Sequence, residues 1–278
     1  MSFDTRFDRP TAEVIGDPIS HSKSPLIHRF WLEQLGLNGD YQACHVAPDL
    51  LADYFAARRS DPNWRGCNVT IPHKLAVLDH AEDRGGVKQS IGAANTVFRE
   101  DGKDSLIATN TDAAGFYAPL SQSDLSGRSA LVIGAGGAAR AVLFALARAE
   151  IGTVALMARN PLKAMALLSG LGVKGEVIGF DAPLPAADLL INASPLGMTG
   201  FDPLPDLDLG RLPNHAIVYD LVYAPLETEL LSVAKARGLE TIDGLSMLIG
   251  QAALAFELFF GAAVPADSEQ QLREKLIA

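Results

Sequence analysis

The stretch Ser129-Ala-Leu-Val-Ile-Gly-Ala-Gly-Gly-Ala-Ala139 decides the fold of this chain. Residues 129–133 are typical of a short buried strand, and an alanine-rich helical pattern follows the glycines. Gly134, Gly136 and Ala139 stand in the three small-residue places of the pattern G-x-G-x-x-G/A. The first permits a tight turn, the second lets the backbone approach a pyrophosphate, and the third lets the helix pack on the sheet. We therefore predict a dinucleotide-binding turn formed by Gly134, Ala135, Gly136, Gly137 and Ala138.

Strand-like and helical patterns alternate in both directions from this stretch. The tail from Met247 is helical, and the strand-like runs on this side occur at residues 154–157, 176–180, 189–192 and 217–221. On the N-terminal side, helical patterns at 26–35 and 48–59 separate strand-like runs at 13–16, 41–46, 66–71, 95–98 and 106–109. This alternation predicts an α/β layer structure. A polar, turn-like pattern near residues 115–127 indicates that the chain crosses between two domains there.

Composition narrows the class of protein. A chain of 278 residues can form two domains, and its 48% hydrophobic and 20% charged residues are typical of a soluble globular protein. A net charge of −10 gives no overall attraction to nucleic acid or to an anionic membrane. Cys44 and Cys67 form no disulfide framework, and no cysteine or histidine pair has metal-ligand spacing. With no apolar signal sequence and an apolar stretch at 252–264 too short to span a bilayer, we expect a metal-free, cytoplasmic protein.

The end of the second strand indicates which cofactor binds. NAD-specific sites usually place Asp or Glu about 20 residues beyond the glycine pattern, where it holds the ribose 2′-hydroxyl. This chain has Arg159 there and Lys163 shortly after. A guanidinium matches the oxygens of a phosphate, such as the 2′-phosphate of NADP. The missing carboxylate and the two cations favour NADP over NAD.

Seven sequence blocks resemble those of the shikimate dehydrogenase family, in the same order and over nearly the whole chain. The first two are Gly16-Asp-Pro-Ile-Ser-His-Ser22-Lys-Ser24-Pro25 and Asn68-Val-Thr70-Ile-Pro72-His-Lys74. The others are Ile91-Gly-Ala-Ala-Asn95-Thr96, Asn110-Thr-Asp112-Ala-Ala-Gly115-Phe116, Asn192-Ala-Ser-Pro-Leu-Gly197-Met198, Asp220-Leu-Val-Tyr223-Ala-Pro225 and Gly244-Leu-Ser-Met247-Leu248-Ile-Gly-Gln251-Ala252. Several blocks in one order are far more specific than a single motif.

The resemblance implies an α/β fold with two domains. Residues 1–112 would form an N-terminal α/β domain that binds substrate and catalyses. Residues 113–246 would form a Rossmann-like doubly wound parallel sheet that binds NADP, and the helices at 247–278 would pack back on the substrate domain. The implied reaction is the NADPH-dependent, reversible reduction of 3-dehydroshikimate to shikimate. The implied partner is this small-molecule substrate. The net charge of −10 argues against a nucleic-acid or membrane partner, and the acidic surface permits either a monomer or a homodimer.

The resemblance also implies the site residues. Lys74 and Asp112 would be catalytic, and Leu221 and Gly244 would lie near the nicotinamide. The implied substrate-binding residues are Ser22, Ser24, Asn68, Thr70, Lys74, Asn95, Asp112, Tyr223 and Gln251. Their chemistry agrees, because hydroxyl and amide groups suit a small polyhydroxylated carboxylate. An ammonium can stabilise and protonate the oxygen that gains charge when hydride reaches its carbon.

The same residues allow more than one interpretation at several positions. Pro72 is favoured at a first helical position, so we expect a helix whose first turn holds Lys74 and whose positive end favours the neutral amine. Ser24 precedes a helical run and could equally be its N-cap. Ala158 stands where the family often has Asn, which predicts a moderate rather than an absolute preference for NADP. The alternative functions are a broader quinate/shikimate dehydrogenase and a non-catalytic sensor of shikimate-pathway acids.

Overall fold

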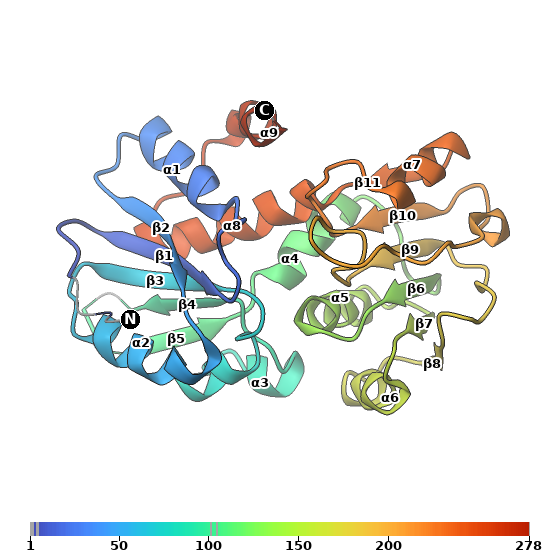
Figure 1. Ribbon diagram of the computed structural model, residues 1–278, viewed down its shortest axis with the longest axis horizontal. Helices are drawn as coiled ribbons and strands as arrows, with labels where there is room; N and C mark the ends of the chain where they lie inside the picture. Colours follow the sequence, from blue (N-terminus) through green and yellow to red (C-terminus); the bar gives the residue numbers. More distant parts are fainter. Residues whose placement is uncertain (1–2, 4–5, 101, 104, 278) are drawn as a thin grey trace. The chain divides into compact units, whose positions relative to one another are not determined.

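The computed structural model describes residues 3, 6–100, 102–103 and 105–277. The chain divides into two compact units, which Figure 1 shows in sequence colours. Unit 1 comprises Met1–Thr111 and Ile249–Ala278, and unit 2 comprises Asp112–Leu248. Among the described residues, no helix has both the length and the apolar character that a membrane span requires.

Unit 1 contains a five-stranded sheet in the order β2-β1-β3-β4-β5. β1 is parallel to β2 and β3, whereas β4 is antiparallel to β3 and β5. The carboxyl ends of β1, β2, β3 and β5 therefore lie at the same edge as the amino end of β4. We call this edge the carboxyl edge of unit 1. The strands are β1 (Thr11–Gly16), β2 (Asp40–His45), β3 (Trp64–Val69), β4 (Thr96–Arg99) and β5 (Leu106–Thr109).

Helices cover both faces of this sheet, with α1 on one side and α2 and α3 on the other (Figure 1). Successive side chains of β1 point to opposite faces of the sheet, so each face has its own buried layer. Ala12 and Val14 join a buried apolar cluster with Ala255 and Phe259. Glu13, on the opposite face, bonds to Tyr54 and Arg58. The helical segments of unit 1 are α1 (Ser24–Gln34), η1 (Pro48–Leu50), α2 (Leu51–Arg59), η2 (Ala76–Asp79), α3 (Val87–Ser90), η5 (Ala266–Ser268) and α9 (Glu269–Ile277). Helix α8 (Gly244–Phe260) begins in unit 2 and continues into unit 1.

One predicted helix is wrong. No α-helix begins at Pro72: residues 71–75 form turns, and the short 3-10 helix η2 follows. An α-helix there would need the carbonyl oxygen of Lys74 to accept from the N–H of Leu78. Instead this oxygen accepts from Ala94, 2.8 Å away, and Leu78 bonds to Leu75. A tertiary hydrogen bond thus overrides the local preference, and the expected effect of a helix end on the Lys74 amine has no structural basis.

Unit 2 contains a six-stranded sheet in which every pair is parallel. Its order is β11-β10-β9-β6-β7-β8. From β6 the chain moves outward to β8, returns to β9 on the other side of β6, and moves outward again. The order reverses between β6 and β9, which is the switch point where α/β sheets bind ligands. The strands are β6 (Ser129–Ile133), β7 (Thr153–Met157), β8 (Gly175–Ile178), β9 (Leu189–Asn192), β10 (Ile217–Asp220) and β11 (Glu240–Ile242).

This arrangement confirms the predicted fold class, including the doubly wound parallel sheet. The helical segments are α4 (Asp112–Tyr117), η3 (Ala118–Leu120), α5 (Gly137–Arg148), α6 (Pro161–Gly170), η4 (Leu209–Arg211) and α7 (Glu229–Ala236). The sequence pattern did not predict α4, because six residues are too few to show a helical period. Packing stabilises it: Phe116 is fully buried and stacks on Tyr219, with ring centroids 5.2 Å apart.

Candidate active site

The carboxyl edge of unit 1 gathers most of the predicted substrate-binding residues. Ser22 and Ser24 follow β1, and Thr70 and Lys74 follow β3. Asn95 directly precedes β4, whose amino end lies at this same edge. Gln251 comes from α8 and meets Asn95, since Asn95 Nδ2 donates to Gln251 Oε1 over 3.3 Å. Residues from four separate sequence blocks therefore lie along one edge of one sheet.

Lys74 is half-buried, and its turn is held from both sides. Its carbonyl oxygen accepts from Ala94, next to Asn95, over 2.8 Å. The neighbouring His73 is fully buried, with Nε2 2.7 Å from the carbonyl oxygen of Val46 at the end of β2. His73 thus anchors the turn that carries Lys74.

Ser22 and Ser24 lie in the loop that leads from β1 into α1. The Ser24 backbone N–H donates to Ser22 Oγ over 3.3 Å, so the two hydroxyl-bearing residues form one turn. Ser24 is 5% exposed. The N-cap position of α1 is Lys23, whose own side chain makes no capping hydrogen bond. The N-cap alternative for Ser24 is therefore wrong, and its buried hydroxyl has to be explained in another way.

Unit 2 brings together the residues that the resemblance places near the nicotinamide. A Cβ on Gly244 would lie 2.5 Å from the carbonyl oxygen of Leu221, so only glycine lets α8 begin this close to the segment after β10. Tyr223, two residues further along, is half-buried, and burial raises its pKa. Asp112 is the first residue of α4 and is 5% exposed.

The glycine-rich turn has the geometry that its pattern predicts. It joins β6 to α5 at the switch point of the sheet. Gly134 has φ +106°, and a Cβ there would lie 3.1 Å from the carbonyl oxygen of Ala193, beyond the end of β9. Gly136, the N-cap of α5, has no atom within 4 Å of where a Cβ would stand. The turn is thus closely packed at its first glycine and open at its second, as a bound pyrophosphate requires.

Arg159 and Lys163 lie where β7 leads into α6, and both side chains are exposed. Asn160 between them is the N-cap of α6, because its Oδ1 accepts from the Lys163 backbone N–H over 3.0 Å. This cap fixes the first turn of α6, with Lys163 in it. The two cations therefore stand at the carboxyl end of the strand next to β6.

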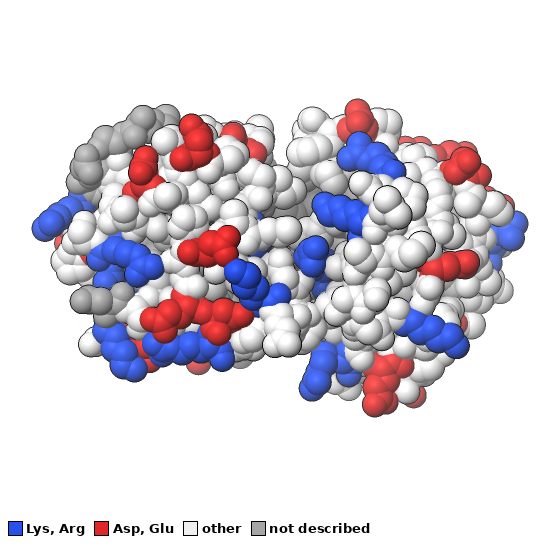
Figure 2. All heavy atoms as spheres, turned by 90° about the horizontal axis from the view of Figure 1, so that it is seen from below, with Lys and Arg blue, Asp and Glu red and all other residues white. Residues whose placement is uncertain are grey.

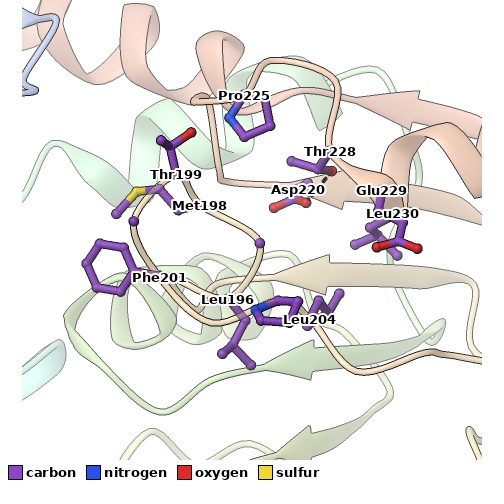
Figure 3. A pocket seen from close by; sticks show the side chains of 13 residues that line it. Leu196, Met198, Thr199, Phe201, Leu204, Asp220, Pro225, Thr228, Glu229 and Leu230 are labelled. Carbon is purple, nitrogen blue, oxygen red and sulfur yellow. Dashed lines mark hydrogen bonds between the residues drawn. The ribbon is translucent and has the colours of Figure 1, made fainter.

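A buried carboxylate that the sequence analysis did not single out ties together the segments after β9 and β10. Asp220 is 1% exposed and accepts from Asn192 Nδ2, from the Val222 backbone N–H and from Thr228 Oγ1 at 3.0, 3.0 and 2.7 Å. Burial raises the pKa of Asp220. Asp220 and Thr228 line a cavity of about 380 Å³, together with residues of the loop after β9 such as Met198 (Figure 3). An Asp that ends a buried strand is the sequence signal that could have identified it.

Charges are mixed on the surface. Figure 2 shows basic and acidic side chains interspersed on the face that it presents. Within the part of the chain that the structure describes, no group of three or more metal-ligating side chains occurs.

The fold and the site define a class of protein: a two-unit oxidoreductase whose parallel sheet carries a dinucleotide-binding turn at its switch point. Comparison with known proteins agrees. The profile of the shikimate dehydrogenase substrate binding domain matches residues 14–97, and that of the shikimate 5'-dehydrogenase C-terminal domain matches residues 244–268. A shikimate dehydrogenase (NADP(+)) from Sphingopyxis alaskensis is 63% identical over 270 residues, which cover 97% of each chain. The chain belongs to the shikimate dehydrogenase family.

Two solved structures show the range of proteins that share this fold. The shikimate 5-dehydrogenase of Thermus thermophilus, in complex with NADP(H) and shikimate, is 38% identical with a TM-score of 0.83, and the match covers 96% of this chain and 99% of that one. The ligand-free 5-ketofructose reductase of a Gluconobacter species is 30% identical with a TM-score of 0.86, covering 97% and 99%. The second match shows that the fold alone does not define the substrate.

Proposed function

We propose that this chain reduces 3-dehydroshikimate to shikimate and oxidises shikimate in the reverse direction, with NADP as cofactor and Lys74 and Asp112 as the proton-transfer pair. The single observation that carries the proposal is the assembly at the carboxyl edge of unit 1. Three groups lie along this edge. They are Lys74, whose carbonyl oxygen accepts from Ala94, the hydrogen-bonded amides of Asn95 and Gln251, and the turn that contains Ser22 and Ser24.

The cofactor fits the residues of unit 2. The open backbone at Gly136 leaves room for a pyrophosphate, and the amino end of α5 offers N–H groups and a partial positive charge. Arg159 and Lys163 would hold the 2′-phosphate of the adenosine ribose. When bound, NADPH supplies the hydride. Leu221 and Gly244, whose backbones meet, would form a wall beside the nicotinamide.

Lys74 would act on the oxygen of the substrate carbonyl. As hydride reaches the carbonyl carbon, electrons move onto this oxygen, and the Lys74 ammonium stabilises the charge and donates a proton. Asp112 would orient the amine and the substrate hydroxyl by accepting hydrogen bonds. In the direction of shikimate oxidation the same pair removes the hydroxyl proton.

The remaining polar residues would bind the carboxylate and the ring hydroxyls. Ser22 and Ser24 offer two hydroxyl donors to the carboxylate, and Asn68, Thr70, Asn95, Tyr223 and Gln251 suit the hydroxyl groups. Cys44 and Cys67 are free thiols, which fits a reducing compartment such as the cytoplasm. The acidic composition is compatible with a monomer or a homodimer.

The test is an assay of NADP reduction with shikimate, quinate and the reduced product of 5-ketofructose side by side. We expect shikimate to give the highest kcat/KM, because the Ser22-Lys23-Ser24 block matches the shikimate form of the family. No NADP reduction with shikimate would overturn the proposed function. A kcat/KM for quinate that equals or exceeds that for shikimate would replace it with a quinate dehydrogenase.

A further inference from the structure

Six buried polar side chains form one continuous hydrogen-bonded network at the carboxyl edge of unit 1. None is more than 7% exposed, and all belong to unit 1. Three carry proposed substrate-binding amides, whereas the other three have no assigned role in the reaction. The amides are Asn68, Asn95 and Gln251, and the three hydroxyl residues are Tyr41, Thr96 and Thr111.

The orientation of the Asn95 amide follows from a group that can only donate. The backbone N–H of Thr111 points to Asn95 over 2.7 Å, so the Asn95 atom that it meets is the oxygen Oδ1. The nitrogen Nδ2 must then face the other way, where it donates to Thr111 Oγ1 over 2.9 Å and to Gln251 over 3.3 Å. Because Nδ2 can only donate, Gln251 turns its oxygen toward Asn95 and carries its own N–H donors on the other edge of the amide.

The same reasoning fixes Asn68. The carbonyl oxygen of Asn95 can only accept, and it lies 3.4 Å from Asn68 Nδ2. Asn68 Nδ2 also donates to Thr96 Oγ1 over 3.1 Å. The Asn68 oxygen therefore faces Tyr41, whose hydroxyl donates to it over 2.7 Å. Burial keeps this hydroxyl protonated by raising the pKa of Tyr41 well above 10.

The two threonines pass this orientation from one amide to the next. Thr96 Oγ1 receives a hydrogen bond from Asn68, so its single proton remains for Asn95 Oδ1, 3.1 Å away, or for Thr111 Oγ1, 3.3 Å away. Thr111 Oγ1 receives from Asn95 Nδ2. Loss of either hydroxyl would remove one acceptor of a buried amide nitrogen and would weaken the preference for this amide orientation.

We propose that Tyr41, Thr96 and Thr111 are positioning residues for substrate binding, which set the donor and acceptor edges of the amides of Asn68, Asn95 and Gln251. Tyr41 is itself held rigidly, because its ring stacks on the buried His28 with centroids 3.9 Å apart and planes 3° apart. The stacked ring thus fixes the hydroxyl that donates to Asn68. This inference rests on the proposed function, because the ligand that the amides would bind is the shikimate of that reaction.

The first test compares Tyr41→Phe with Tyr54→Phe. Both tyrosines are fully buried in unit 1, and each substitution removes one donated hydrogen bond. The Tyr41 hydroxyl donates to Asn68 in the network, whereas the Tyr54 hydroxyl donates to Glu13, away from the network. Tyr41→Phe should raise the KM for shikimate about fivefold, the equivalent of one net hydrogen bond, and leave kcat and the KM for NADP within about twofold. Tyr54→Phe should lower thermal stability and leave all three parameters unchanged.

The second test uses rescue by a conservative variant. Thr96→Val keeps the shape but removes the hydroxyl, whereas Thr96→Ser keeps the hydroxyl. We expect the KM for shikimate to rise for Val and to return to within about twofold of the parent value for Ser. Thr11→Val is the matched control, because Thr11 is equally buried in β1 and its hydroxyl donates to the carbonyl oxygen of Arg9, away from the network.

Calorimetric titration of shikimate into each full-length variant keeps the test decisive where turnover is lost. Weaker shikimate binding by Tyr41→Phe and Thr96→Val, but not by the two controls, supports the proposal. An unchanged shikimate affinity in both variants overturns it, and so does a Thr96→Ser variant that binds as weakly as Thr96→Val. A parent protein with no shikimate activity would overturn the proposed function instead.

Discussion

The backbone N–H of Ala94 donates to the carbonyl oxygen of Lys74 over 2.8 Å. This bond joins the turn after β3 to the segment that leads into β4, and Asn95 is the next residue of that segment. The bond uses only backbone atoms. A substitution at position 74 should therefore remove the amine without moving the turn that carries it. The neighbouring bond between the His73 side chain and the carbonyl oxygen of Val46 does not involve Lys74, so the substitution should leave it intact as well.

Replacement of Lys74 by alanine should act chiefly on kcat. The amine acts on charge that develops in the transition state, so ground-state binding should suffer less. General acid–base groups contribute about 10²–10⁴-fold, and we expect a loss on the order of a thousandfold in steady-state assays. Lys88→Ala is the control, because Lys88 is exposed and pairs with Asp79. A Lys74→Ala variant with normal kcat and only a raised KM would exclude the catalytic role.

Glu13→Gln should destabilise unit 1 strongly without any effect on the site. Glu13 is 2% exposed and accepts from Arg58 Nε and Nη2 at 2.7 and 3.0 Å, and also from Tyr54 and Trp64. Removing one partner of a buried pair leaves the other charge uncompensated, which costs about 3–5 kcal/mol. Urea unfolding measures the loss. The exposed Arg29–Asp40 pair is the control, and Arg29→Gln should change stability by less than about 1 kcal/mol.

The sequence predicted those features that depend on local pattern. The strand at 129–133, the glycine turn and the strands at 189–192 and 106–109 are confirmed because buried strands are continuous apolar runs and the turn needs glycine at fixed places. The helix at Pro72 was wrong because a distant backbone group, Ala94, competes for the carbonyl oxygen of Lys74. Local propensity carries no information about such a partner.

The network around Asn95 could not be predicted for the same reason. Tyr41 lies 27 residues from Asn68, and Asn95 lies 156 residues from Gln251, so only the folded chain brings them together. The resemblance named the three amides but not the hydroxyls that orient them. The partner of Glu13 could not be predicted either. The apolar run around Glu13 predicts a strand, but Arg58, to which Glu13 bonds, is 45 residues away. The roles assigned to the site residues, and the functional division at residues 112 and 246, stay predictions.

Asp188→Asn should reveal a pH-dependent bond between two strands of unit 2. The Ser129 backbone N–H donates to Asp188 and, with the Ser129 hydroxyl and His215, lowers the pKa of Asp188 to about 2. A lowered carboxyl pKa stabilises the native state above the unfolded value of about 4, and this contribution is lost as pH falls toward 2. Because the carboxyl is partly exposed, we expect a loss of only about 1 kcal/mol in the variant at neutral pH.

The measurement is urea unfolding of the parent and Asp188→Asn proteins between pH 7 and pH 3. The difference in free energy of unfolding should shrink as the pH falls. A difference that is independent of pH would contradict this account. His215→Gln should have the smaller effect at neutral pH, since the largest cause of the lowered pKa is the Ser129 backbone N–H rather than His215.

Arg159→Asp should reduce the preference for NADPH over NADH. Arg159 is exposed at the carboxyl end of β7, beside the strand that carries the glycine turn, where the adenosine ribose is expected. The substitution removes a donor for the 2′-phosphate, adds repulsion toward it and offers the NADH ribose an acceptor. A charge-assisted hydrogen bond contributes about 1.5–3 kcal/mol, which corresponds to a rise of about one to two decades in the KM for NADPH.

The matched control is Lys174→Asp, which changes the net charge equally. Lys174 is exposed and directly precedes β8, so it lies at the amino end of the parallel sheet, away from the glycine turn. The control should leave the NADPH/NADH ratio of kcat/KM unchanged, whereas Arg159→Asp should lower it at least about tenfold. Lys163→Ala should lower it less, because Lys163 supplies a point charge rather than a planar pair of donors. A parent enzyme that prefers NADH, or an Arg159→Asp variant with the parent ratio, would show that another group selects the cofactor. Since Ala158 replaces the family's usual Asn, the parent preference itself should be moderate, and a detectable rate with NADH is expected even before substitution.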